Sequence, residues 1–343
     1  MSTGGCAGER SAGERSAGEA AVLGRLRRLL PGPPTGETWF GDDAAVLRVP
    51  GPKGGPLLLL AADAVVGGLD ADLALTSLAD LGWKAMAVNL SDIAAMGGRP
   101  AHAVVSVVGL APDEIEELYA GVLAAAAEYG CPVVGGDLSG GDQVVVSVAI
   151  TGWVDGAPVL RSGARPGDQL WVTGAVGAAA AGLRWLRAHH GAGQDLAERS
   201  SEAVLVRAHA RPRPAVAEGA AARAAGATAM IDVSDGLIAD LGRLAAASSV
   251  GFDLLGVDQL PVAVGATVEE ALSGGDDYVL AFALPAGAHA REEFERAGLP
   301  SPHLVGTCVE DARQRTSAGR ALVAGGWEHD LYGTSRRTKD LPQ

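Results

Sequence analysis

The stretch 231–237, Ile-Asp-Val-Ser-Asp-Gly-Leu, puts two carboxylates and a hydroxyl into one short turn. The apolar run 228–231 leads into it and indicates a buried strand, while leucines at helical spacing follow it and indicate a helix. A strand that opens onto a helix N-terminus gathers free N–H groups and the positive end of the helix dipole, which suits phosphate. Two aspartates would repel that phosphate unless a cation separated them, and hard oxygen ligands favour Mg²⁺. A simple helix cap by Ser234 or Asp235 explains this single turn equally well.

Aspartates at strand ends or on a helix face recur in the first half of the chain. Asp63 ends the apolar run 57–62, where a carboxylate is costly unless it is paired or metal-bound. Asp92 follows Asn89 by three residues on a helical pattern, so the two side chains share a face. The other members follow glycine near predicted strands: Asp42, Asp43 and Asp137. Because neighbouring side chains on a strand point to opposite faces, only one of the adjacent pair is expected to serve a shared site.

Strand and helix patterns alternate along the body of the chain, which predicts an α/β or α+β fold. We expect two domains, 20–155 and 156–330, with a turn-rich segment at 160–168 opening the second. Residues 1–19 repeat small and charged residues and are expected to be a disordered tail. Residues 331–343 are polar and are expected to be a frayed tail.

The charge balance limits the kinds of partner that the chain can have. It carries 41 acidic and 27 basic side chains, a net charge of −14, whereas nucleic-acid binding requires a basic face. Its apolar runs fall short of the ~20 residues that span a membrane, and its N-terminus has no apolar segment typical of a signal peptide. Three widely spaced cysteines fit a reducing compartment. We therefore expect a cytoplasmic protein that binds neither nucleic acid nor a membrane.

Lysine is rare, and Lys84 is expected to extend along its packed helix toward solvent, with pairing to a site carboxylate as the alternative. The chain lacks the P-loop motif, the protein-kinase catalytic loop and a Cys/His cluster for zinc. A strand, glycine turn and helix around 174–177 suits either a phosphate or close packing. What remains is a set of carboxylates from many loops, as several Mg²⁺ ions around a nucleotide triphosphate require. The residues alone thus indicate a metal-dependent site compatible with a nucleotide.

Eight motifs occur in order between residues 20 and 330. They are Gly-Asp-Asp-Ala-Ala at 41–45, Asp63, Asp-Leu-Gly-Trp-Lys-Ala at 80–85 continuing into Asn-Leu-Ser-Asp-Ile-Ala-Ala-Met-Gly at 89–97, Gly-Gly-Asp at 135–137, Leu-Arg-Ser-Gly-Ala-Arg-Pro-Gly-Asp at 160–168, Thr-Gly at 173–174, Asp-Val-Ser-Asp-Gly-Leu at 232–237 and Ser-Gly-Gly-Asp-Asp-Tyr at 273–278. In these motifs the chain resembles the thiamine-monophosphate kinases, a branch of the aminoimidazole-ribonucleotide synthetase superfamily.

The resemblance implies a two-domain α/β (α+β) fold and a homodimer in which the N-terminal sheets pair into a barrel. It implies that the N-terminal domain binds ATP and several Mg²⁺ ions, and that the γ-phosphate passes directly to thiamine monophosphate. The metal ligands implied by position are Asp42, Asp63, Asp92, Asp137, Asp232 and Asp235, of which Asp42 and Asp235 would be catalytic. Arg161 and Ser234 would touch ATP, and Gly136 and Asp137 would lie beside it. Trp327 resembles the aromatic residue that packs on the thiamine.

The chain departs from the family pattern on the acceptor side. The family usually has Thr-Thr-Asp where this chain has Ala-Ala-Asp at 61–63, and Thr-Thr where residues 138 and 139 are Leu-Ser. A substrate-contacting histidine is usual where Asp70 stands, and a glutamate is usual where Asp276 stands. The metal carboxylates are kept while the acceptor side differs. The alternatives are therefore a related enzyme that phosphorylates another small molecule, or a non-catalytic nucleotide-binding module.

Overall fold

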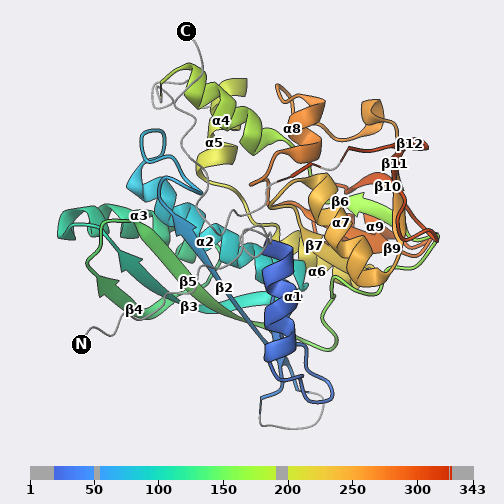
Figure 1. The fold of residues 1–343 in the computed structure, drawn as a ribbon, viewed down its shortest axis with the longest axis horizontal. Coiled ribbons are helices and arrows are strands. Elements are labelled where there is room, and N and C mark those ends of the chain that lie inside the picture. The colour runs from blue at the N-terminus through green and yellow to red at the C-terminus, as the bar shows by residue number, and fades with distance from the viewer. Residues whose placement is uncertain (1–18, 50–54, 191–199, 324, 327–343) are drawn as a thin grey trace, which may run out of the picture.

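The chain folds around two β-sheets that share one long helix (Figure 1). The computed structural model describes residues 19–49, 55–190, 200–323 and 325–326. The predicted mixed α/β class is confirmed, because both sheets carry helices. In the part of the chain that the structure describes, no helix is both long and apolar enough to cross a membrane. The predicted tails and Trp327 lie outside the described residues.

The first sheet has the strand order β1-β2-β5-β3-β4. Its strands are β1 (Ala45–Leu47), β2 (Leu57–Val66), β3 (Arg99–Val108), β4 (Val133–Ser139) and β5 (Val145–Val154). All neighbours are antiparallel except β3 and β4. Helices α2 (Leu78–Ala95) and α3 (Pro112–Glu128) cover one face, onto which alternate side chains of β5 point. The other face carries exposed apolar side chains such as Leu60 and Val104.

The second sheet has the order β12-β11-β8-β10-β6-β9-β7. Its strands are β6 (Gln169–Val172), β7 (Ala229–Asp232), β8 (Gly251–Leu254), β9 (Leu280–Leu284), β10 (His303–Val309), β11 (Arg315–Ser317) and β12 (Arg320–Ala321). All neighbours are antiparallel except β8 and β11. Helix α7 (Leu237–Ser248) packs in a core on one face, and α6 (Val216–Ala224) and α9 (Ala290–Arg296) pack on the other. The remaining helices are α1 (Glu19–Leu29), α4 (Ala178–Ala188), α5 (Ser201–Ala210), α8 (Val268–Ser273) and the short 3₁₀ helix η3 (Val257–Gln259).

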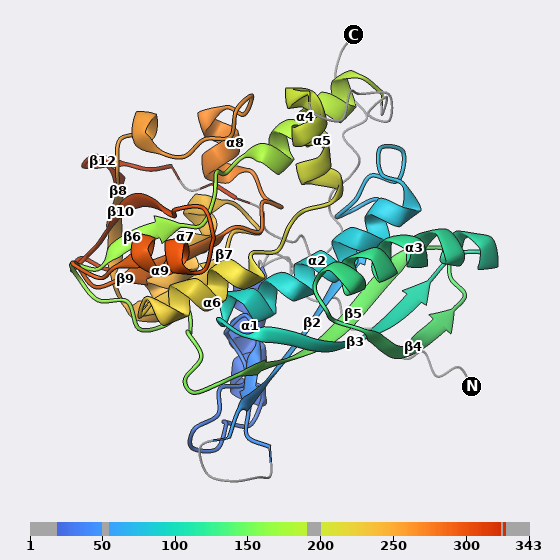
Figure 2. The ribbon, with the colours of Figure 1, turned by 180° about the vertical axis from the view of Figure 1, so that it is seen from behind.

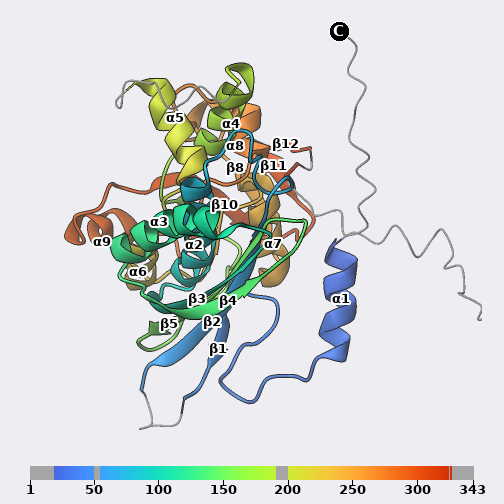
Figure 3. The same cartoon turned by 90° about the vertical axis from the view of Figure 1, so that its left-hand side faces the viewer.

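Helix α2 belongs to both cores, which decides where a site can form. Its sequence is apolar almost all round, as expected for a helix buried between layers. Most of its residues pack into the core of the first sheet, whereas Ala94 and Ala95 at its C-terminal end pack with α6 and the second sheet. Figure 2 shows α2 running from the first sheet toward α6, and Figure 3 shows α1 standing apart from this body.

Close backbone contact sets the position of α2 against α3. A Cβ atom added at Gly121 on α3 would lie 1.6 Å from the carbonyl oxygen of Ala79, and one added at Gly82 on α2 would lie 2.1 Å from that of Leu118. Both distances are shorter than any van der Waals contact, so the two helices meet where neither has a side chain. This crossing fixes how closely α2 and α3 pack against each other.

Gly121→Ala is expected to lower the free energy of unfolding by about 1–3 kcal/mol, because the added methyl group forces α2 and α3 apart. Chemical denaturation followed by circular dichroism measures the change. The matched control is Gly242→Ala on α7, where nothing lies within 4 Å of the added Cβ. That substitution should stabilise the protein by up to ~1 kcal/mol, since alanine is the better helix former. Equal stability of wild type and Gly121→Ala would contradict the packing argument.

Candidate functional site

Three aspartates from distant parts of the chain meet where the two sheets share α2. Asp43 precedes β1, Asp92 lies in the last turns of α2, and Asp232 ends β7. Each offers one carboxylate oxygen, and these three oxygens all lie within 4.8 Å of one another. We call these three residues the carboxylate trio. The short buried strand β7 delivers Asp232 to this place, as the apolar run before it predicts.

Burial makes the trio electrostatically costly. Burial, and then the charges of Asp43 and Asp240, raise the pKa of Asp232 well above its usual value. Burial, and then the charges of Asp232 and Asp63, do the same to the pKa of Asp92. The carboxyl groups of Asp92 and Asp232 therefore disfavour their ionised forms in the folded protein.

One carboxylate oxygen of the trio is left without a hydrogen-bond donor among the described residues. The guanidinium Nη2 of Arg161 lies 2.6 Å from Oδ1 of Asp43. The other oxygen of that carboxylate, Oδ2, is buried and has no hydrogen-bond partner among the described residues. An acceptor-only atom in such a place fits a metal ligand, and clustered carboxylate oxygens suit a hard divalent cation. The donor set of the trio thus fits Mg²⁺.

The adjacent aspartates of the 41–45 motif do different things. Asp43 joins the trio, whereas the carboxylate of Asp42 accepts hydrogen bonds from the backbone N–H of Arg161 at 3.1 and 3.2 Å. Burial, followed by the charge of Asp43, raises the pKa of Asp42 to about 6. Sequence reasoning selected Asp42 and passed over Asp43. The ligand and catalytic roles of Asp42 stay predictions.

Two polar residues of α2 support the site from the first domain. Ser91 Oγ donates a hydrogen bond of 2.7 Å to Oδ2 of Asp232. Asn89 Oδ1 accepts one of 2.9 Å from the backbone N–H of Asp63. Helical spacing had placed Asn89 on the face of Asp92, but Ser91 gave no signal of its own because a buried serine is unremarkable in a helix.

The turn at 231–237 is capped in a way that the sequence did not predict. Neither Ser234 nor Asp235 caps α7; the carboxylate of Asp240 accepts from the N–H groups of Asp235 and Gly236 at 3.0 and 3.1 Å. Arg243 Nη1 lies 2.5 Å from both Asp235 and Asp240. Asp240 therefore orders the turn in front of α7 through the N–H groups of Asp235 and Gly236. The metal role of Asp235 and the ATP contact of Ser234 stay predictions.

The glycine turn at 174–177 holds an internal carboxylate too. Asp277 accepts hydrogen bonds from the N–H of Gly177 at 2.6 Å and of Ala179 at 3.1 Å, at the start of α4. Burial raises the pKa of Asp277 to about 6. Of the two interpretations of this turn, the phosphate site is wrong, because the donors that would bind phosphate are taken by Asp277.

The acceptor-side residues gather around Lys84. Its Nζ lies 2.6 Å from Oδ2 of Asp276 and 3.4 Å from the backbone oxygen of Asp70. The expectation that Lys84 extends to solvent is wrong, because its side chain is only 3% exposed and its ammonium group needs a buried partner. The carboxylate of Asp70 turns back to accept from the N–H of Val66. The substrate roles of Asp70, Asp276 and Trp327 stay predictions.

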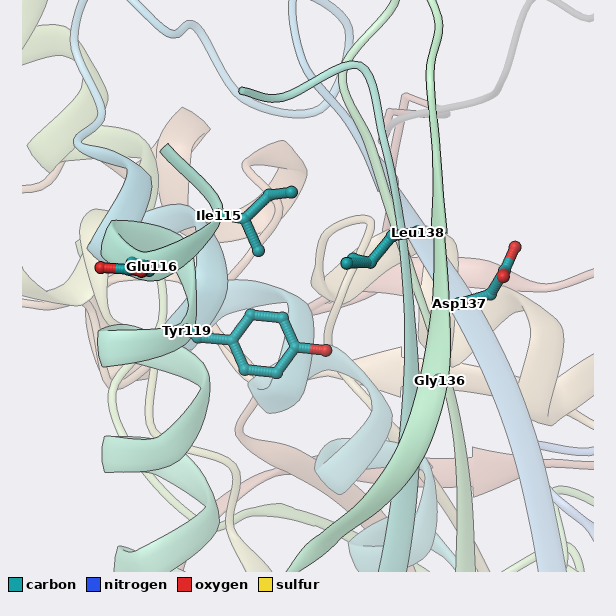
Figure 4. Close-up of a pocket in the computed structure, with 6 residues that line it drawn as sticks. All are labelled: Ile115, Glu116, Tyr119, Gly136, Asp137 and Leu138. Carbon is teal, nitrogen blue, oxygen red and sulfur yellow. The ribbon is translucent and has the colours of Figure 1, made fainter. Parts of the chain in front are cut away.

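A cavity of about 550 Å³ lies between α3 and β4. It is lined by Ile115, Glu116, Tyr119, Gly136, Asp137 and Leu138. In Figure 4 the ring of Tyr119 points from α3 toward β4, while the carboxylate of Asp137 points away on the far side of the strand. The predicted nucleotide residues Gly136 and Asp137 thus border a cavity, but Asp137 is not part of the trio. Tyr119 could not be found from sequence, since one aromatic residue on a helix is usually core.

Two mixed domains that meet at a buried carboxylate trio define an AIR synthase related protein. The family models for AIR synthase related protein, N-terminal domain and C-terminal domain, match residues 41–154 and 165–318. Within this group the chain belongs to the thiamine-monophosphate kinase family. It is 38% identical over 260 residues to thiamine-monophosphate kinase of Salmonella typhimurium, covering 73% of this chain and 77% of that one.

Further relatives agree with this placement. Thiamine-monophosphate kinase of Mycobacterium tuberculosis is 40% identical over 278 residues, which are 76% of this chain and 78% of that protein. A solved structure, AaThiL complexed with AMPPCP and TMP, superposes with a TM-score of 0.79 at 29% identity, covering 94% of this chain and 99% of that one. These matches confirm the two-domain α/β (α+β) fold implied by the sequence motifs, while the pairing of N-terminal sheets across a homodimer stays a prediction.

Asp92→Asn is expected to stabilise the metal-free protein at neutral pH by about 1–3 kcal/mol, the usual size of a single-residue effect. A carboxyl whose pKa is raised by folding stabilises the protein below its unfolded pKa, and this contribution is lost as the pH rises through the folded pKa. Ionisation of Asp92 therefore weakens the metal-free fold, and the variant removes this charge.

Thermal unfolding with a chelator and with excess Mg²⁺ measures both parts of this prediction. Mg²⁺ should raise the Tm of the wild type and should raise that of Asp92→Asn less. Asp155→Asn is the control, because Asp155 is an exposed carboxylate paired with Arg99. A variant that loses stability in chelator and keeps the full response to Mg²⁺ would contradict the trio as a cation site.

Proposed function

We propose that this protein transfers the γ-phosphate of ATP to thiamine monophosphate, giving thiamine diphosphate and ADP. The observation that carries the proposal is the carboxylate trio at the junction of two domains in a chain that belongs to the thiamine-monophosphate kinases. The similar structure with AMPPCP and TMP supports the choice of both substrates.

The transfer is direct. An oxygen of the acceptor phosphate forms a bond to the γ-phosphorus, the bond from that phosphorus to the β–γ bridging oxygen breaks, and ADP leaves with the electron pair. Mg²⁺, when bound, neutralises the phosphoryl oxygens and holds the reactants in line. Asp43, Asp92 and Asp232 would hold one such ion. Asp42, Asp63, Asp137 and Asp235 are the ligands that the sequence motifs propose for further ions.

The residues of this chain supply orientation and fixed charge. Arg161 is held by Asp43, so its guanidinium stays at the edge of the trio, where it can meet a phosphate oxygen. Ser91 holds the Asp232 carboxylate in one rotamer. Fixed donors and charges of this kind stabilise developing charge without reorganising during the reaction.

The cavity beside Gly136 receives the nucleotide base. Its volume is in the range of small-molecule sites, roughly 300–1,000 Å³. Tyr119 offers an aromatic face on the α3 side, and Gly136 and Leu138 of β4 line the other side. The predicted ATP contacts of Arg161 and Ser234 would follow the phosphates from there toward the trio.

The working form is a homodimer formed through the open face of the first sheet. Leu60 on β2 and Val104 on β3 are 41% and 40% exposed on that face, and β5 lies between their strands. An apolar sheet face left in water is costly and typical of an interface. A barrel built from two such sheets would bury it.

The first test is product formation from thiamine monophosphate and ATP, with and without Mg²⁺. Mg²⁺-dependent thiamine diphosphate and ADP are expected from the wild type.

Asp235→Asn is expected to lower kcat by about 100-fold or more. The fold should survive, because Arg243 keeps its pair with Asp240. Near-normal turnover in this variant would contradict a metal role for Asp235. ATP binding without turnover of thiamine monophosphate would point to another acceptor.

Val104→Glu is expected to convert the dimer to a monomer, because it places a charge in the middle of the apolar sheet face. Sedimentation velocity measures the change. The control is Val264→Glu, at a loop residue that is 85% exposed, and it should stay dimeric. A monomeric wild type, or a Val104→Glu variant that remains dimeric, would refute this interface.

A further inference from the structure

Lys84 joins the two domains through a buried charge. It lies on α2, and its partner Asp276 lies in the loop between α8 and β9 of the other domain. The Asp276 side chain remains 32% exposed, so a ligand can still reach a carboxylate that Lys84 holds from behind. A buried ammonium group between two domains either stabilises their packing or positions a residue of a binding site.

The loop that carries Asp276 has a backbone that needs holding. Asp276 and Tyr278 have φ of 67° and 51°, in the left-handed region that side chains other than glycine seldom adopt. The Tyr278 hydroxyl donates a hydrogen bond of 3.0 Å to Oδ1 of Asp276, while Lys84 engages Oδ2. Both oxygens of this carboxylate are thus directed by the protein. A strained backbone conformation that several surrounding contacts hold in place is characteristic of binding and catalytic loops.

The same loop is bonded to the loop of the carboxylate trio. The N–H of Asp276 donates to the carbonyl of Ser234 at 2.8 Å, and the N–H of Tyr278 donates to that of Val233 at 2.9 Å. Ser91 bonds Asp232 two helical turns beyond Lys84, and a spacing of seven residues keeps the two side chains on one face of α2. One helix face therefore fixes the Asp276 loop and the trio together.

We propose that Lys84 is a positioning residue for the phosphate acceptor, acting through Asp276. Lys84 sets the Asp276 carboxylate at a defined place relative to the trio, where it accepts a hydrogen bond from a donor group of the acceptor. It also neutralises a carboxylate that would otherwise repel the acceptor phosphate. The inference rests on the proposed function and adds a specificity-determining residue to it.

The test compares Lys84→Met, Asp276→Asn and the double variant by steady-state kinetics with each substrate varied in turn. Lys84→Met should raise the KM for thiamine monophosphate at least about 10-fold, a loss typical of a charged hydrogen bond. The KM for ATP should stay within about two-fold of the wild-type value. In the Asp276→Asn background, Lys84→Met should raise the acceptor KM no further, because Lys84 acts through that carboxylate.

Arg211→Met is the matched control. Arg211 follows α5 and pairs with Asp80 of α2 at 2.5 Å, so it also ties α2 to a neighbouring segment but does not touch Asp276. It should lower the Tm and leave the acceptor KM unchanged. If Lys84→Met behaves in the same way, Lys84 is structural and the inference is overturned.

Two further outcomes separate the possible failures. Should Lys84→Met not fold, the comparison of the double variant with Asp276→Asn carries the test. The double variant removes both charges, and in Asp276→Asn the Lys84 ammonium keeps the backbone oxygen of Asp70 as a partner. A higher acceptor KM in the double variant than in Asp276→Asn overturns the inference. A wild type without Mg²⁺-dependent turnover overturns the proposed function and this inference together, whereas wild-type turnover with an unchanged acceptor KM in Lys84→Met overturns the role of Lys84 alone.

Discussion

Repulsion among three buried carboxylates governs this structure. Asp43 and Asp92 come from the first domain and Asp232 from the second; the charge of Asp43 raises the cost of burying Asp232 and Asp92, and that of Asp232 raises the cost of burying Asp92. Arg161 compensates for part of this charge and is itself held by Asp43. The remaining imbalance is one that a divalent cation, when bound, would relieve. Activity and stability are consequently linked through the same few atoms.

Helix α2 makes that arrangement possible because it is rigid and shared. Its contact with α3 leaves no space for a side chain at Gly82 or Gly121, and its far end is packed against α6. Polar residues on one face of a helix held so firmly cannot retreat from each other. The energy needed to keep Lys84, Ser91 and Asp92 in place therefore comes from apolar packing elsewhere on the same helix.

Local patterns predicted the fold class and the aspartates at strand ends, because both follow from short-range periodicity. The details that local patterns did not predict depend on distant partners. The choice between Asp42 and Asp43 is made by Arg161, 118 residues beyond Asp43, and the orientation of Lys84 by Asp276, 192 residues away. The helical periodicity of apolar residues in α5 is weak, because only Leu205 and His209 of this helix are buried. The hydrogen bonds that the carboxylates of Asp240 and Asp277 accept were missed, because neither residue occupies the usual N-cap position of the helix concerned.

The Asp277 cap has a consequence for ligand binding. The N-terminus of α4 is a natural anion site, and it already holds a carboxylate that is tethered to the same chain. A tethered competitor acts at an effective concentration that a free ligand seldom reaches, commonly in the ~mM range or above. For an enzyme whose substrates and products all carry phosphate groups, this cap closes a decoy site away from the carboxylate trio.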